Sequence, residues 1–383
     1  MRATREGRAA GPGCWIPAAP TEPVYRLRAT PGGVRHSCYR PRVKGAPVLA
    51  ALVLLLEGCG RAGPSAVAVP SPSPTAVPTP ATLHPVSGVV FYDENANGVI
   101  DDGEDVRLPH VVLTLGGRST ESDAEGSFAA SAVPAGTRPV EIRPESLPPQ
   151  FRAGRVPTVA IPLPEGARVP VPVVLPIGSN QPNTYLAFGD SITAGDGSRG
   201  SRGYRSALQS RLRDYWGRAE VIADGIESTR SDDGRDRIAG SLAAEHPAYV
   251  LILYGTNDWN LSACHRVITC FTIENARSMI RQAKAAGTIP VLSTIIPVNP
   301  AYVNRLADER NFWVDETNKA LVPMARAEGA IVADLNAAMK AETPDLPELF
   351  TDHVHPNDHG YSVMADAFFR ALTQPVGTAA ARD

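Results

Sequence analysis

Four short stretches of this 383-residue chain carry the residue types that nucleophilic catalysis uses. They are Gly-Asp-Ser at 189–191, Gly225 after an apolar run, Gly-Thr-Asn-Asp at 255–258, and Asp352 with His355. A serine hydroxyl becomes an effective nucleophile when an imidazole accepts its proton and a carboxylate orients that imidazole. The residue types therefore predict a triad of Ser191, His355 and Asp352.

Ester hydrolysis also needs hydrogen-bond donors for the negative oxygen that forms during attack. The candidates are the backbone N–H groups of Ser191 and Gly225 and the side-chain amide of Asn257. His353 stands beside Asp352, but adjacent residues on a turn point apart, whereas a separation of three brings side chains together. We therefore choose His355 as the base. Each stretch alone also has an ordinary explanation as a helix cap or a turn.

The elements that must position these residues alternate between two patterns. Continuous apolar runs at 184–189, 219–225, 249–255, 288–296 and 330–335 are separated by segments with helical spacing. The predicted helices include 204–216, 273–286, 307–328 and 360–373. This alternation predicts an α/β domain whose parallel sheet is covered on both faces. Ligands bind beyond the carboxyl ends of such strands, which is where the serine, glycine and asparagine fall.

In this order and spacing, "FGDSITAG", Gly225, "GTND" and "DHVHP" resemble the four signature blocks of the SGNH (GDSL) hydrolase family over residues 183–373. The resemblance implies a flavodoxin-like three-layer α/β/α fold and hydrolysis of esters or thioesters without a catalytic cofactor. It implies Ser191 as nucleophile, Gly225 and Asn257 as oxyanion donors, and Asp352 and His355 as the rest of the triad. The chain departs from the family at Asp224 and at Glu227–Ser228, where asparagine and a second glycine are common.

These observations predict an exported serine ester hydrolase that cleaves an acyl or acetyl ester through an acyl-enzyme. Two alternatives stay open: an O-acyltransferase acting on carbohydrate, and a weakly active glycan-binding surface protein. The expected partner is a small-molecule or carbohydrate ester. A net charge of −3 gives no basic footprint for nucleic acid.

Residues 86–178 are Val-rich runs separated by turn residues, which predicts a small β-sandwich. Its "DENANGVIDDGE" stretch has the spacing of a Ca²⁺ loop, with a glycine at the bend. The expected ligands of a structural Ca²⁺ are Asp93, Asn95, Asn97, Asp101, Glu104 and the carbonyl of Val99. The alternative is an acidic turn without an ion. The region resembles the calcium-binding B-type, prealbumin-like repeats of bacterial surface adhesins, which implies a stalk or spacer.

The first 59 residues have the layout of a leader with a lipoprotein-like signal: arginines, a short apolar core, and then Cys59 as the candidate for lipidation. A plain cleaved signal and an uncleaved anchor remain alternatives. A Pro-rich linker at 60–85 and a flexible tail at 374–383 are expected around the folded parts. An extracytoplasmic, membrane-anchored or secreted location follows, and there Cys264 and Cys270 are expected to form a disulfide.

Overall fold

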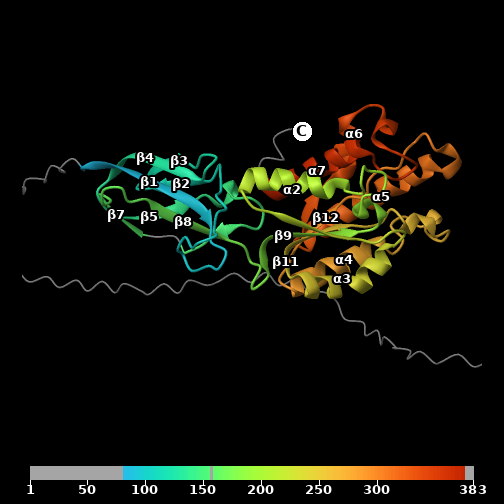
Figure 1. Ribbon diagram of the computed structural model, residues 1–383, viewed down its shortest axis with the longest axis horizontal. Helices are drawn as coiled ribbons and strands as arrows, with labels where there is room; N and C mark the ends of the chain where they lie inside the picture. Colours follow the sequence, from blue (N-terminus) through green and yellow to red (C-terminus); the bar gives the residue numbers. More distant parts are fainter. Residues whose placement is uncertain (1–80, 156–157, 376–383) are drawn as a thin grey trace, which may run out of the picture. The chain divides into compact units, whose positions relative to one another are not determined.

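The computed structural model describes residues 81–155 and 158–375 (Figure 1). The leader, the signal, Cys59, most of the linker and the end of the tail lie outside the described residues, so those expectations stay predictions. Within the described ranges, every helix is too short or too polar to cross a bilayer.

The N-terminal β region contains two four-stranded sheets, ordered β4-β1-β8-β6 and β3-β2-β5-β7. Strands β1, β2, β5 and β8 are those that the Val-rich runs predict, and their buried valines and leucines share one core. The bounds are β1 Leu83–Tyr92, β2 Val112–Leu115, β3 Arg118–Glu121, β4 Ser127–Pro134, β5 Gly136–Ile142, β6 Arg152–Ala153, β7 Thr158–Ile161 and β8 Val169–Val174. A small β region therefore precedes the α/β domain, as expected.

The α/β domain is built on a five-stranded sheet whose strand pairings are all parallel. Each predicted apolar run forms a strand: β9 Gln181–Gly189, β10 Glu220–Gly225, β11 Pro247–Leu253, β12 Ile289–Ser293 and β13 Ile331–Ala333. Their spatial order is β10-β9-β11-β12-β13. Counted from the domain's first strand this is the 2-1-3-4-5 order of flavodoxin-like folds. The predicted α/β class with a parallel sheet is confirmed.

Helices cover both faces of this sheet (Figure 1). Along β9, Tyr185 and Ala187 pack in one core with residues of α2 and α7, while Leu186 and Phe188 pack in another with residues of α3, α4 and α5. The alternation follows from the two-residue period of a strand. The helices are α1 Ser191–Ala194, α2 Gly203–Trp216, α3 Ser231–Glu245, α4 Thr272–Ala285, α5 Ala307–Ala327, α6 Leu335–Glu342 and α7 Asp358–Thr373.

The strand order fixes where a site can form. The chain leaves β9 towards β10 on one side, and β11 lies on the other side of β9. A crevice opens at such a topological switch point, beyond the carboxyl ends of the two neighbouring strands. Ser191 lies two residues beyond Gly189, the last residue of β9, and Asn257 lies four residues beyond Leu253, the last residue of β11. The topology therefore brings these two residues to one edge of the sheet.

Candidate active site

Ser191 is the first residue of α1, a single helical turn that begins where β9 ends. The Asp190 carboxylate accepts a 2.9 Å hydrogen bond from the Ile192 N–H and so caps this turn. Gly195 ends it with a φ of 99°, a left-handed conformation that glycine adopts at little cost. The short turn holds the Ser191 side chain at the edge of the sheet, where it is 8% exposed.

Asp352 and His355 lie on the turn before α7, and this turn organises itself around the aspartate. One carboxylate oxygen of Asp352 accepts hydrogen bonds from the N–H groups of Val354, at 2.8 Å, and His355, at 2.7 Å. The other oxygen lies 2.8 Å from His355 Nδ1, and His355 Nε2 lies 2.9 Å from Ser191 Oγ. The ring of His353 is farther from Asp352, at 3.9 Å. His355 is therefore the histidine that bridges the aspartate and the serine.

The two acidic groups at the site have opposite pKa shifts. Burial raises the pKa of Asp352, but hydrogen bonds from the His355 ring and from the N–H groups of His355 and Val354 outweigh it and hold the pKa below its usual value. Asp352 is therefore ionised at neutral pH, as an orienting carboxylate must be. Burial raises the pKa of Asp190 to about 7, only partly opposed by the hydrogen bond from Ile192.

The two other candidate oxyanion donors lie close to the Ser191 turn. A Cβ on Gly225 would lie 2.3 Å from the Ala194 nitrogen, so the end of β10 packs directly against the backbone of α1. The side-chain nitrogen of Asn257 donates to the Thr229 carbonyl at 2.9 Å and lies 3.4 Å from an Asp190 carboxylate oxygen. Its amide is thus held beside the residue that precedes the serine.

The loop after Gly225 accommodates its departure from the family pattern. Ser228 has a φ of 61°, so a left-handed residue stands where the family often has a second glycine. The Asp224 carboxylate pairs with Arg237 at 2.5 Å, and the same guanidinium donates to the Gly189 carbonyl at 3.0 Å. Asp224 therefore ties β10 to the end of β9.

Cys264 and Cys270 form a disulfide in the loop between β11 and α4. Inside this loop the Val267 carbonyl accepts a 3.1 Å hydrogen bond from the Trp313 indole on α5. The loop is thus fixed against α5, on the side of the sheet edge where Asn257 lies.

Three polar residues near the site were not identified from the sequence: Asp190, Asn299 and Arg310. The Asn299 amide donates to the Asp352 carbonyl at 3.1 Å, and Arg310 donates to the Thr256 carbonyl at 2.6 Å. Asn299 carries no visible signal, because asparagine is common in loops. Arg310 carries one: it occupies the apolar face of α5 in register with Trp313, Val314 and Leu321.

The predicted calcium loop folds around its own acidic residues. Asp93 and Glu104 are 2% and 5% exposed, and within the described residues neither lies within ion-pair distance of a basic group. Their carboxylates accept hydrogen bonds from the N–H groups of Asn97, Gly98, Glu94 and Asp101. Across the described ranges no group of three or more His, Cys, Asp or Glu side chains is arranged to hold a metal. Any site here would need asparagine and backbone oxygens as well.

Comparison with known proteins identifies the larger domain. The sequence profile of the GDSL-like Lipase/Acylhydrolase family matches residues 187–363. Esterase TesA of Pseudomonas aeruginosa is 32% identical over 143 residues, which cover 37% of this chain and 69% of that protein. An acetylxylan esterase of Geobacillus stearothermophilus is 25% identical over 217 residues, 51% of this chain and 95% of that protein.

Solved structures of similar proteins match about half of the chain. The lipase/acylhydrolase from Enterococcus faecalis is 23% identical, with a TM-score of 0.44 over 50% of this chain and 95% of that one. Axe2, an acetylxylan esterase from Geobacillus stearothermophilus, is 22% identical, with a TM-score of 0.43 over 52% of this chain and 96% of that one. On the sequence matches, the chain belongs to the GDSL-like lipase/acylhydrolase family and is an ester hydrolase.

Proposed function

We propose that the chain hydrolyses acyl or acetyl esters through an acyl-enzyme on Ser191. His355 accepts the serine proton as Oγ attacks the ester carbonyl, and it then donates that proton to the departing alcohol. In the second half, His355 removes a proton from the water that attacks the acyl carbon, and it returns this proton to Ser191 Oγ as the acid is released. Asp352 holds the imidazole in orientation and stabilises its positive charge.

The oxyanion of each tetrahedral intermediate binds to the N–H groups of Ser191 and Gly225 and to the Asn257 amide. Such donors lower the barrier because they are aimed in advance at the charge that develops. Asn257 would exchange its bond to the Thr229 carbonyl for one to the oxyanion. The observation that carries the proposal is the hydrogen-bonded series from Asp352 through His355 to Ser191, with distances of 2.8 and 2.9 Å.

The test is turnover of 4-nitrophenyl acetate by the wild type and by Ser191→Ala, with Ser206→Ala on the exposed face of α2 as the matched control. The loss expected for Ser191→Ala is at least about 10⁴-fold in kcat, the scale seen when a triad serine is removed. Mass spectrometry of the quenched wild type should find the acyl group on Ser191. Equal turnover by the two variants would refute the proposed nucleophile.

For the substrate, we propose short acyl esters, including acetylated carbohydrate, since one relative is an acetylxylan esterase. A panel of 4-nitrophenyl esters of increasing chain length and of acetylated polysaccharides tests this. Excess sugar acceptor in the same assay separates hydrolysis from acyl transfer, because a transferase would form acetylated sugar in place of free acetate. A preference for long acyl chains would contradict the proposal.

We also propose that the loop from Asp93 to Glu104 binds a structural Ca²⁺. Two buried carboxylates without a basic neighbour in the described structure would be stabilised by a hard cation. The amide nitrogens of Asn95 and Asn97 both donate to one Asp101 oxygen, each at 2.6 Å, so these three side chains of the motif lie together. Gly98, with a φ of 82°, permits the sharp bend. The B-type repeat resemblance of this region remains part of the proposal.

The loop also contacts the α/β domain. Its Glu94 side chain accepts a 2.6 Å hydrogen bond from Asn183 at the start of β9, and its Gly103 carbonyl accepts one from Arg218 at 2.7 Å. Chelation of Ca²⁺ should therefore lower the melting temperature of the wild type and have no effect on Glu104→Gln. The exposed Glu125→Gln is the control. An unchanged wild-type melting temperature would count against the ion.

Finally, we propose export and lipid attachment at Cys59 on the strength of the sequence alone. Labelling with a palmitate analogue in a bacterial host, compared with Cys59→Ala, tests this. Label on the wild type but not on the variant supports it, and an unlabelled, unprocessed wild type contradicts it.

A further inference from the structure

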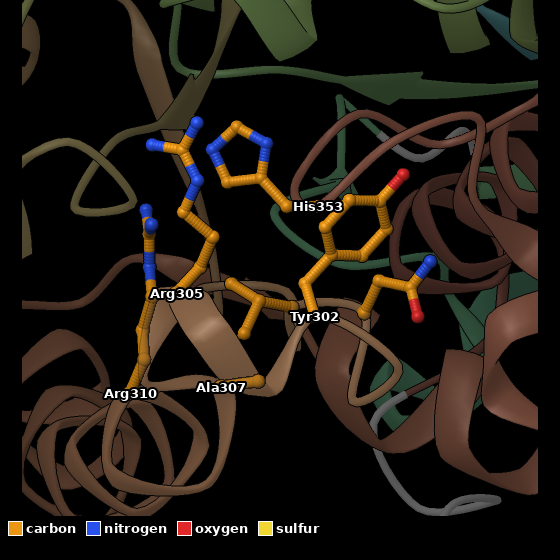
Figure 2. Close-up of a pocket in the computed structure, with 7 residues that line it drawn as sticks. Tyr302, Arg305, Ala307, Arg310 and His353 are labelled. Carbon is orange, nitrogen blue, oxygen red and sulfur yellow. The ribbon is translucent and has the colours of Figure 1, made fainter.

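A small pocket lies beside the candidate triad, between the loop after β12 and the turn that carries Asp352 (Figure 2). Asn299 joins these two segments, because its backbone N–H donates to the His353 carbonyl and its amide donates to the Asp352 carbonyl, both at 3.1 Å. Arg310 joins the pocket to the turn that carries Asn257 through its bond to the Thr256 carbonyl. Residues that line the pocket are thus hydrogen-bonded to the turn that carries Asp352 and to the turn that carries Asn257.

The lining of this pocket is positively charged. The charge comes from Arg305 and Arg310, since burial and these two arginines lower the pKa of His353 and leave its imidazole neutral at neutral pH. Asn299 and Tyr302 also line the pocket, and no aspartate or glutamate does. Figure 2 shows the guanidinium of Arg305 next to the imidazole of His353, with the guanidinium of Arg310 close by. Within the described residues neither arginine forms an ion pair with a carboxylate within 4.0 Å.

Arg310 is the unusual member of this set. It is 4% exposed, and its Nε is buried without a hydrogen-bond partner among the described residues. Burial lowers its pKa to about 10, although the charge of Asp190 opposes the shift, so it remains a cation at neutral pH. A buried cation with unused donors is costly unless an anion or acceptor meets it. The cavity has no room for a water molecule as it stands, so an anion can reach the unused donor only when the exposed Arg305 side chain moves aside.

We propose that Arg305, Arg310 and His353 form a subsite for a carboxylate that the substrate carries close to its scissile ester. Arginine suits this role because its planar fork can bind both carboxylate oxygens at once. The inference rests on the proposed function at Ser191 and narrows it to esters with a neighbouring negative charge. The carboxylate can belong to the acyl part, as in a half-ester of a dicarboxylic acid, or to the alcohol part, as in an acetylated uronic acid.

A purely structural role explains only part of the arrangement. Arg310 could serve to hold the Thr256 carbonyl, but this leaves its Nε and the neighbouring Arg305 without a purpose. Arg305 is exposed, and within the described residues its side chain has no hydrogen bond or ion pair that holds it in place. Arg305 is therefore the better position for a test, since its replacement leaves the buried contacts of Arg310 intact.

The experiment compares kcat/KM within two matched pairs of esters. The first pair is 4-nitrophenyl pentanoate and mono-4-nitrophenyl glutarate, whose acyl chains have the same length and differ only in the terminal methyl or carboxylate group. The second is an acetylated methyl glucoside and the corresponding acetylated methyl glucuronide, which differ by a carboxylate on the alcohol. The wild type should prefer the anionic member of at least one pair, and the pair concerned identifies the side on which the carboxylate lies.

Arg305→Gln should lower this preference about tenfold, the effect of losing one hydrogen bond to a charged group. Arg305→Lys should keep part of it, and added salt should weaken it. Arg326→Gln, an exposed arginine near the end of α5, removes the same charge away from the pocket and should leave the preference unchanged. Equal kcat/KM within both pairs for the wild type, or a preference that persists in Arg305→Gln, overturns the inference.

Failure of the proposed function gives a different pattern, in which the wild type turns over none of the four esters or Ser191→Ala remains active. The subsite is then tested by calorimetric titration of the wild type and Arg305→Gln with free glutarate and free glucuronate. Binding by the wild type that weakens about tenfold in the variant supports the subsite. Absence of binding to the wild type, or equal binding by both proteins, refutes it.

Discussion

Asp190 provides a quantitative test of the site's electrostatics. Its side chain is 1% exposed, directly before Ser191, and burial raises its pKa from the ordinary 3.8 to about 7. Below pH 3.8 the carboxyl is protonated in both the folded and the unfolded chain. Between pH 3.8 and about 7 the folded chain keeps the proton that the unfolded chain has lost, so the free energy of unfolding falls as the pH rises.

The size of this effect follows from the pKa difference. One pKa unit corresponds to about 1.36 kcal/mol, and the interval from 3.8 to about 7 is roughly three units, which gives about 4 kcal/mol. Asp190→Asn has no titrating group here, and its amide oxygen can still accept from the Ile192 N–H. Relative to the wild type, the variant should therefore become more stable by about 4 kcal/mol as the pH rises from 4 to 8.

Urea unfolding followed by tryptophan fluorescence at several pH values from 4 to 8 measures this difference. Asp214→Asn on the exposed surface of α2 is the control, and its difference from the wild type should not change with pH. A constant offset between Asp190→Asn and the wild type over this range would mean that Asp190 ionises at its ordinary pKa. Burial would then have no net effect on the ionisation of Asp190.

Three further perturbations test the geometry. Gly225→Ala should lower kcat for 4-nitrophenyl acetate at least about 100-fold, because the new Cβ would lie 2.3 Å from the Ala194 nitrogen and displace α1. A kcat close to that of the wild type would contradict this prediction. Asp352→Asn should lower kcat about 10⁴-fold, because the asparagine amide would favour the wrong tautomer of the His355 imidazole. A loss of less than tenfold in the same assay would mean that Asp352 is not a member of the triad. Replacing Cys264 and Cys270 by serine should lower the free energy of unfolding in urea by about 2 kcal/mol, and reductant should not change the stability of this variant. If the variant were as stable as the oxidised wild type, the disulfide would have no stabilising role.

The strands of the α/β domain could be predicted because burial on both faces requires continuous apolar runs, such as 247–253, every residue of which is buried. Helix α3 could not. Its large buried side chains are only Ile238 and Leu242, and it approaches the sheet through Gly234, where a Cβ would lie 2.6 Å from the Tyr254 ring. A helix that packs through a small residue leaves little apolar period to detect. Strand β3 was missed for a related reason, since three of its four residues are exposed.

The candidate triad could be predicted because each of its members stands at the end of an element that the sequence itself marks. The environment of those members could not, because it depends on contacts between distant segments. An aspartate before a short helix is expected as an exposed cap, and nothing in the sequence indicates that Asp190 is buried. Arg310 was not recognised because arginine is common in helices. Only its position on the apolar face of α5 distinguishes it from the other arginines.

The distance between Ser191 and His355 is set mainly by backbone contacts, and this explains why motifs alone do not establish it. The segment after α1 meets the turn before α7 at Gly197, whose φ is 86° and whose Cβ would lie 2.6 Å from the Pro356 carbonyl. The Gly197 carbonyl in turn accepts a 2.9 Å hydrogen bond from Thr351. On the other side, Asn299 holds the Asp352 carbonyl. The turn that carries His355 is therefore fixed from two sides. The 2.9 Å distance between His355 Nε2 and Ser191 Oγ is thus set by the fold and does not need bound substrate to form.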